Sequence, residues 1–329
     1  YQYIKMTDSE QRINLLVTGG CGFIGSNFIN HVFASNKYHI VNFDAMYYCA
    51  DEKNVSSDIR SHTNYTLVKG NLCSEDLINH ILGSYQIDQV VHFAAQSHVQ
   101  NSFDDSLQFT KDNILGTHVL LECCRKYGKI QKFIHVSTDE VYGESMNSVD
   151  EKHKTEHSIL CPTNPYAATK AGAELIAQSY NHSYKMPIII TRGNNVYGPN
   201  QYPEKLIPRF IQLLQQDKPV TIQGAGSSVR AFLHARDTAS AFQCILETGR
   251  IGEIYNIGCD EGMEYSVLEV AKMLIRKIKN TEDYDKWITY IEDRPFNDQR
   301  YYISNQKLKD LGWTIAVKFE QGIDALLSD

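Results

Sequence analysis

The chain has 329 residues, enough for one large or two medium-sized domains with a substantial core. A net charge of −7 and a pI near 6.0 do not favour a nucleic-acid-binding surface, and no apolar segment approaches the roughly 20 residues of a membrane span. Eight scattered cysteines lack Cys-x-x-Cys spacing and the twelve histidines add no ligand pattern, so we predict no metal site. With no apolar leader either, we expect a soluble cytoplasmic protein with reduced thiols.

The first predicted element is a short apolar strand over 14–18, followed by a glycine-rich turn and an amphipathic helix over 26–35. A dinucleotide fingerprint requires strand, glycine turn and helix in this order. The spacing here is Gly-x-x-Gly-x-x-Gly, through Gly19, Gly22 and Gly25. Residues without Cβ let the backbone approach a pyrophosphate, which then lies against the helix N-terminal N–H groups. The turn therefore predicts a dinucleotide site.

Asp44 closes the next predicted strand, over 39–43. It lies about 20 residues past the glycines, where an acidic side chain binds the ribose hydroxyls of adenosine. Because a carboxylate would repel a 2′-phosphate, this position favours NAD over NADP. The alternative is an ordinary turn residue at a strand end.

Strands and helices continue to alternate along the chain. We predict further strands over 65–68, 88–95, 132–136 and 187–192, and helices over 75–82, 112–127 and 166–184. This alternation predicts an α/β fold with a doubly wound parallel Rossmann sheet. We expect an NAD-binding domain over 12–192, with a returning segment near 230–247, and a smaller mixed α/β substrate domain over 193–329.

Two adjacent carboxylates, Asp139 and Glu140, follow the strand over 132–136 in the segment Ser-Thr-Asp-Glu-Val-Tyr-Gly, residues 137–143. They are expected at the C-terminal end of that strand, which is the edge of an open α/β sheet where ligands bind. The alternative is that both acids cap the next helix.

Tyr166 and Lys170 lie four residues apart, on one face of a helix. A phenol titrates near 10, so it is a poor base at neutral pH unless a positive charge favours the phenolate. We expect Lys170 to supply that charge and an oxidised nicotinamide ring to add another. Tyr166 then takes a proton from a substrate hydroxyl oriented by Thr138 while hydride leaves for NAD. A surface pair at helical spacing is the alternative, and the dinucleotide motif before it makes that reading weaker.

Together these motifs resemble the extended short-chain dehydrogenase/reductase family, over about 12–313 of the chain. Residues 137–143 resemble the nucleotide-sugar 4,6-dehydratases, with Asp139 as the discriminating residue. The resemblance implies oxidation at C4 by Tyr166 and tightly held NAD, loss of water across C5–C6, and return of hydride to C6. It implies that Glu140 removes the C5 proton and that protonated Asp139 donates to the leaving 6-hydroxyl. Neighbouring carboxylates raise one another's proton affinity, which suits this division.

The resemblance also implies a set of cofactor contacts. They are Gly19, Gly22, Phe23, Ile24, Gly25, Asp44, Asn71, Leu72, Phe93, Ala94, Ala95, Ser97, Asp112, Tyr166, Lys170 and Val196. Asn71 and Asp112 depart from the bacterial dTDP-glucose enzymes, which usually have Asp at the first position and often Thr at the second. The resemblance therefore defines the contacts to the adenine of the cofactor less closely than the other cofactor contacts.

The implied substrate contacts are Ser97, Thr138, Asn194, Asn195, Lys205, Leu206, Gln223, Arg230, Arg294 and Asn297. Arg230 and Arg294 are expected to clamp the diphosphate, assisted by Lys205 and Asn195, because guanidinium forks bind two phosphate oxygens at once. For any single cation, a solvated surface position is the usual alternative.

Segments 93–99, 191–201 and 294–301 resemble the dehydratase module of UDP-rhamnose synthases more than the dTDP-glucose enzymes. We therefore predict a hydro-lyase of rhamnose biosynthesis that converts UDP-glucose to UDP-4-keto-6-deoxyglucose, with dTDP-glucose as the alternative substrate. A non-catalytic NAD-binding regulator is the hypothesis from another class, and the intact catalytic residues argue against it. Because the family usually dimerises through two helices per subunit, we expect a homodimer through the helices that begin near 112 and 166.

Overall fold

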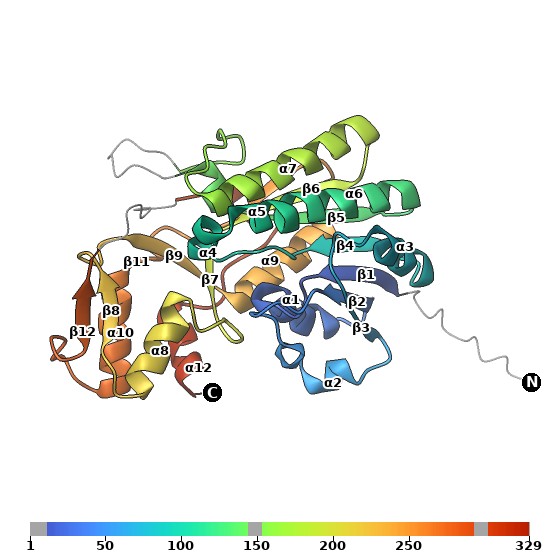
Figure 1. The fold of residues 1–329 in the computed structure, drawn as a ribbon. Helices are drawn as coiled ribbons and strands as arrows, with labels where there is room; N and C mark the ends of the chain where they lie inside the picture. The colour runs from blue at the N-terminus through green and yellow to red at the C-terminus, as the bar shows by residue number, and fades with distance from the viewer. Residues whose placement is uncertain (1–11, 144–152, 293–301, 329) are drawn as a thin grey trace, which may run out of the picture.

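The structure is a computed structural model that describes residues 12–143, 153–292 and 302–328. Its centre is a seven-stranded parallel sheet with helices on both faces (Figure 1), which confirms the predicted doubly wound architecture. In spatial order the strands are β10 (Ile254–Ile257), β6 (Ile188–Gly193), β5 (Lys132–Thr138), β4 (Gln89–His92), β1 (Ile13–Thr18), β2 (Tyr38–Asp44) and β3 (Tyr65–Lys69).

Each strand sends alternate side chains into two hydrophobic cores. Leu15 and Val17 of β1 pack in one core with Phe28, and Leu16 between them packs in the other with Ile78. The first core lies under α1 (Phe23–Phe33) and α9 (Ala235–Thr248), and the second under α3 (Glu75–Ser84), α6 (Gly116–Tyr127) and α7 (Pro165–Tyr184). Burial on both faces explains why these strands are apolar almost throughout.

The carboxyl ends of the central strands meet at one edge of the sheet. Thr18 pairs with His92, His92 with His135, and Thr138 with Gly193. The residues that follow β1, β4, β5 and β6 are therefore brought together although they lie far apart in the sequence, and this edge carries the site.

A second, smaller lobe follows β6 (Figure 1). It contains the sheet β11–β9–β7 and the parallel pair β12–β8, packed with helices around a core that includes Phe210, Leu274 and Phe319. Its elements are β7 (Asn195–Tyr197), α8 (Leu206–Gln215), β8 (Val220–Gln223), β9 (Val229–His234), β11 (Glu264–Ser266), α10 (Val267–Lys279), β12 (Ile288–Ile291) and α12 (Phe319–Ser328). Between β9 and β11 the chain returns to the large sheet as α9 and β10.

Several short elements lack a sequence pattern long enough to predict. They are η1 (Glu52–Asn54), α2 (Ser57–Arg60), α4 (Val99–Asp104), α5 (Ser106–Phe109) and the 3-10 helix η3 (Asp139–Tyr142). The short helix α11 (Gln306–Lys309) lies within residues 305–311, where the sequence does predict a helix. The helix predicted over 112–127 is wrong at its start, where the π-helical segment η2 (Thr110–Leu115) precedes α6. The strand predicted over 88–95 ends at His92, because residues 93–95 leave the sheet to line a cavity.

Among the described helices, none combines the length and apolar character needed to cross a bilayer. The same part of the chain contains no cluster of three or more His, Cys, Asp or Glu side chains able to hold a metal ion.

Candidate active site

A cavity of about 330 Å³ opens at the carboxyl edge of the large sheet and extends to residues of the second lobe. Every residue that the family resemblance implies as a cofactor contact lines it, from the glycine turn to Val196. The catalytic candidates Thr138, Asp139 and Glu140 line the same space. The fold thus brings together side chains from five separate βα connections and from the loop that enters the second lobe.

The glycine turn at one end of the cavity leaves no room for side chains. Gly19 has φ +73°, a conformation that glycine favours, and a Cβ there would lie 2.7 Å from the Ala94 backbone. A Cβ on Gly25 would overlap the Gly19 carbonyl. Helix α1 begins directly after Gly22, so its first N–H groups and positive dipole end face the turn. This cradle fits a pyrophosphate.

Asp44 lies buried beside this cradle. Its Oδ2 accepts a hydrogen bond from Cys21 N at 2.9 Å and its Oδ1 accepts one from Met46 N at 2.8 Å. Burial raises the pKa of the carboxyl, and the two backbone hydrogen bonds oppose that rise. The held carboxylate retains acceptor capacity toward a ribose, so these residues fit an NAD-type dinucleotide.

Asn71 and Asp112, the two departures from the bacterial pattern, are joined through a residue that sequence reasoning missed. Asn71 Nδ2 donates to Tyr47 Oη at 2.8 Å, and Tyr47 Oη donates to Asp112 Oδ1 at 3.3 Å. All three line the cavity. The polar wall at this end is therefore a connected group rather than isolated contacts.

The paired acids lie on η3, the turn that ends β5. Thr138 Oγ1 accepts from Glu140 N and donates to Asp139 Oδ1, both at 3.3 Å, and Asn194 Nδ2 donates to Asp139 Oδ2 at 2.6 Å. Asp139 is 2% exposed, and burial, reinforced by the charge of Glu140, raises its pKa to about 7. Asn164 Nδ2 donates to Glu140 Oε2 at 3.0 Å. A carboxyl that stays protonated near neutral pH thus adjoins a half-buried acid.

Tyr166 and Lys170 lie on α7, which begins with Asn164 accepting from Ala167 N at 2.8 Å and with Pro165 in the first turn. Both side chains are buried. Burial lowers the pKa of Lys170 to about 8, and its ammonium donates to the Val136 carbonyl at 2.6 Å.

The pKa of Tyr166 is raised, first by burial and then by Glu140 and Asp139, while a hydrogen bond with Thr138 opposes the rise. We expected the Lys170 charge to favour the phenolate. In this structure burial and the two acids raise the pKa of the phenol, and the Lys170 ammonium is engaged by the Val136 carbonyl.

The profile of the GDP-mannose 4,6 dehydratase family matches residues 16–326. The chain belongs to this family. The resemblance to nucleotide-sugar 4,6-dehydratases is thereby confirmed.

Two curated relatives illustrate the range of proteins that the chain resembles. It is 50% identical over 311 residues to a trifunctional UDP-glucose 4,6-dehydratase, 3,5-epimerase and reductase of Arabidopsis thaliana, covering 94% of this chain and 46% of the relative. It is 45% identical over 313 residues to the dTDP-D-glucose 4,6-dehydratase of Homo sapiens, and the match covers 94% of this chain and 87% of the human protein. The chain thus spans about half the length of the plant relative.

Solved dehydratases share the fold. The dTDP-glucose 4,6-dehydratase DesIV of Streptomyces venezuelae, described with NAD and TYD bound, is 35% identical with a TM-score of 0.88 over 96% of each chain. The dTDP-glucose 4,6-dehydratase of Bacillus anthracis, described in complex with NAD, is 39% identical with a TM-score of 0.86 over 96% of each chain.

The predicted substrate contacts fall into three groups. Ser97, Thr138, Asn194, Asn195 and Lys205 line the cavity, and Lys205 Nζ donates to the Ser97 carbonyl at 3.3 Å. The second group, not among the cavity-lining residues, lies in the second lobe and comprises Leu206, Gln223 and Arg230. Arg294 and Asn297 lie outside the described residues. The diphosphate clamp therefore stays a prediction.

The raised pKa of Asp139 predicts a pH-dependent stability. The folded protein holds this proton up to about pH 7, whereas an exposed aspartate releases it near 3.8, so the stabilisation present at low pH is lost as the pH rises through about 7. Asp139→Asn removes the titration. We expect the melting temperature of the native protein relative to the variant to fall between about pH 5 and pH 7 and then to level off. Thermal denaturation of both proteins across this range measures it, and a constant difference would contradict it.

Proposed function

We propose that this chain is a UDP-glucose 4,6-dehydratase, converting UDP-glucose to UDP-4-keto-6-deoxyglucose and water with tightly bound NAD. The observation that carries the proposal is the protonatable, buried Asp139 beside Glu140, set against Tyr166 and Lys170 at the end of a dinucleotide cradle. An epimerase needs only to oxidise and reduce one carbon. An elimination, by contrast, needs one group that removes a proton from carbon and another that gives a proton to the leaving oxygen, and an adjacent acid pair can supply both.

When bound, NAD supplies a hydride acceptor at C4 and a hydride donor at C6. As a phenolate, which the positive charges of Lys170 and of oxidised NAD would favour, Tyr166 takes the proton of the 4-hydroxyl. Thr138, hydrogen-bonded to its neighbours on η3, orients that hydroxyl. Lys170, fixed by the Val136 carbonyl, keeps a positive charge near the phenol when protonated.

The new C4 ketone makes the C5 proton acidic, and Glu140 removes it. Asn164 holds one oxygen of Glu140 and so fixes the direction of the carboxylate. Asp139, with a pKa of about 7, donates its proton to the departing 6-hydroxyl, which leaves as water. Asn194 and Thr138 hydrogen-bond the oxygens of Asp139 and hold it in place for this transfer.

Uridine is proposed as the base because the plant UDP-glucose module is more similar to this chain than the human dTDP-glucose enzyme, at 50% against 45% identity. One methyl group in a pocket is worth about 1–3 kcal/mol, so we expect kcat/KM to differ about tenfold to a few hundredfold. A non-catalytic regulator on this fold would not need the buried groups Asp139, Tyr166 and Lys170 together with the half-buried Glu140.

Separate incubations with UDP-glucose and dTDP-glucose test this function. We expect a product lighter by one water from both, formed faster from UDP-glucose. UDP-glucose carrying deuterium at C4 should give product with that deuterium at C6, and reaction in heavy water should place solvent deuterium at C5. No loss of water from either sugar would exclude a dehydratase. Faster reaction of dTDP-glucose would overturn the proposed preference for uridine and leave the proposed dehydratase activity standing.

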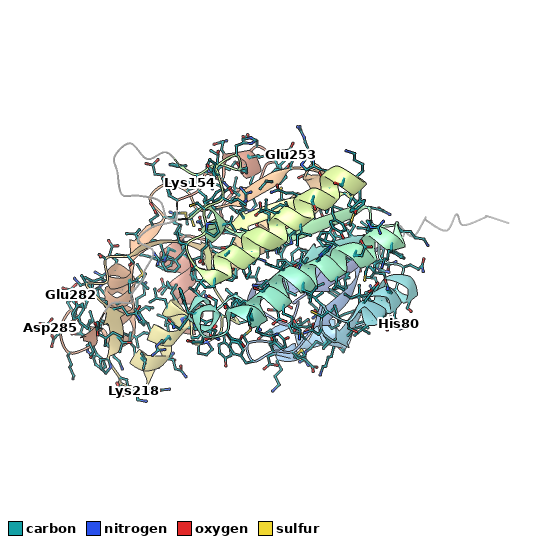
Figure 2. All side chains as sticks on the ribbon, turned by 45° about the horizontal axis from the view of Figure 1, so that its top comes forward. His80, Lys154, Lys218, Glu253, Glu282 and Asp285 are labelled. Carbon is teal, nitrogen blue, oxygen red and sulfur yellow. The ribbon has the colours of Figure 1, made fainter. Side chains whose placement is uncertain are left out.

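We also propose a homodimer through α6 and α7, which run side by side over one face of the sheet (Figure 2). Leu175 of α7 and Leu115, which directly precedes α6, are about half exposed, and Leu107 on α5 is 81% exposed. Such an apolar face is typical of a partner surface. We expect Leu175→Glu to shift sedimentation toward the monomer, whereas Ile251→Glu, at an exposed site elsewhere, should not. Equal sedimentation of both variants would contradict this seam.

The eight free thiols support a reducing, cytoplasmic location, which we propose with the function.

A further inference from the structure

A buried polar group lies behind the proposed catalytic residues and outside the cavity lining. Its centre is Arg192 of β6, which is 2% exposed. The guanidinium pairs with Glu174 of α7, which is completely buried, and Nη1 donates to Tyr142 Oη at 2.7 Å. Tyr142 Oη in turn donates to Asn256 Oδ1 of β10 at 2.8 Å.

The members of this group sit on the two elements that carry the catalytic side chains. Tyr142 is the last residue of η3, whose first two residues are Asp139 and Glu140. Glu174 lies one helical turn after Lys170 and two after Tyr166 on α7. A single guanidinium therefore connects the turn that carries the acids to the helix that carries the tyrosine and lysine.

The geometry of the connection is specific. Besides the hydrogen bond, the Arg192 guanidinium carbon lies 4.6 Å from the centre of the Tyr142 ring, and Nη1 also donates to the Glu156 carbonyl at 3.1 Å. Asn256 is fixed in turn, because its N–H donates to Glu156 Oε1 at 2.9 Å. The planar guanidinium fork, with five N–H donors in fixed directions, satisfies the carboxylate, the phenol and the carbonyl together.

We propose that Tyr142 and Arg192 are positioning residues that hold Asp139 and Glu140 at the correct distance from the sugar bound by Tyr166 and Lys170. Neither touches the cavity, so neither takes part in proton transfer. Loosening η3 displaces the acids and leaves α7 in place, because the Arg192–Glu174 pair does not depend on the phenol. The role rests on the proposed dehydratase function, and it concerns the elimination step alone.

Tyr142→Phe tests the proposal, since it removes one hydroxyl and keeps the ring. Misplacing a catalytic group by about 1 Å can lower the rate of the step it serves by up to about 100-fold. We therefore expect the rate of water loss to fall by about 10- to 100-fold, while the rate of oxidation at C4 changes less than about twofold. The absorbance of the reduced cofactor should then persist during turnover. Hydrogen–deuterium exchange should quicken at the amides of 139–143 and not at those of α7.

Tyr255→Phe is the matched control. Its hydroxyl is also buried and accepts one hydrogen bond, from Arg250 N at 3.1 Å, but it has no bond to η3. We expect Tyr255→Phe to lower the melting temperature about as much as Tyr142→Phe does, while the rates of oxidation at C4 and of water loss stay unchanged. Equal slowing of both steps by Tyr142→Phe, or unchanged elimination, would overturn the positioning role.

If Tyr142→Phe does not fold, Arg192→Lys gives the same test, because lysine keeps the charge beside Glu174 without the fork that reaches Tyr142. Normal elimination in that folded variant would likewise overturn the proposal. If the native protein removes no water from either sugar, the proposed function fails instead, and the exchange measurement still reports whether Tyr142 orders η3.

Discussion

Replacing Tyr166 with Phe is expected to stop the reaction before any cofactor is reduced. Hydride leaves C4 as the proton of the 4-hydroxyl departs, and Tyr166, which lines the cavity, is the residue proposed to receive that proton. Losing a general base typically costs on the order of 10²–10⁴ in rate. Stopped-flow absorbance of the reduced cofactor and product mass should therefore both stay at background when the variant meets UDP-glucose.

The variant should still fold and bind both ligands, because its ring is retained and its backbone N–H still donates to Ser102 Oγ at 3.2 Å. Tyr180→Phe is the control on the same helix. It loses a hydroxyl that donates to Glu122 Oε2 at 3.0 Å, outside the cavity. Reduction of the cofactor by Tyr166→Phe at a rate near that of Tyr180→Phe would show that another group accepts the proton.

The central sheet and the cofactor end of the cavity could be predicted from the sequence because their signals are local. The apolar strand over 14–18, the glycine spacing and Asp44 each occupy a fixed place in one βα unit. The register of parallel strands then brings the ends of β1, β4 and β5 together without further information.

Other features depend on pairings across the fold. Asn164 carries a helix-start signal with Pro165, but nothing local indicates that its amide also holds Glu140. Tyr47 becomes part of the site only because Asn71 and Asp112, from other connections, reach it. The short strand β10, with four residues, gives too weak a pattern to place it at the edge of the sheet.

The pKa shifts of Tyr166 and Asp139 also depend on burial and on contacts across the fold, which the local sequence does not reveal. The prediction for Tyr166 weighed the charges of Lys170 and of an oxidised nicotinamide ring, whereas in this structure burial and two neighbouring acids raise the pKa of the phenol. For Asp139 the pairing with Glu140 gave the correct sign, although burial makes the larger contribution.

Asp139→Asn and Glu140→Gln are expected to separate the two halves of the reaction. Both substitutions keep the size of the side chain and remove either the proton donor or the base, so the loss of about 10²–10⁴ in rate should fall on elimination. Oxidation at C4 needs neither acid. It should even be favoured in Glu140→Gln, because Glu140 is one of the charges that raise the pKa of Tyr166.

Rapid mixing of each variant with NAD and UDP-glucose gives the measurement. The absorbance of the reduced cofactor should rise at least as fast as in the native protein and then decay slowly, whereas native turnover leaves little of it. Glu282→Gln and Asp285→Asn, exposed changes in the second lobe far from the large sheet (Figure 2), control for lost charge and should behave as native. If either acid variant binds both ligands yet forms no reduced cofactor, that acid also serves the oxidation, because a group confined to elimination cannot block a step that precedes it.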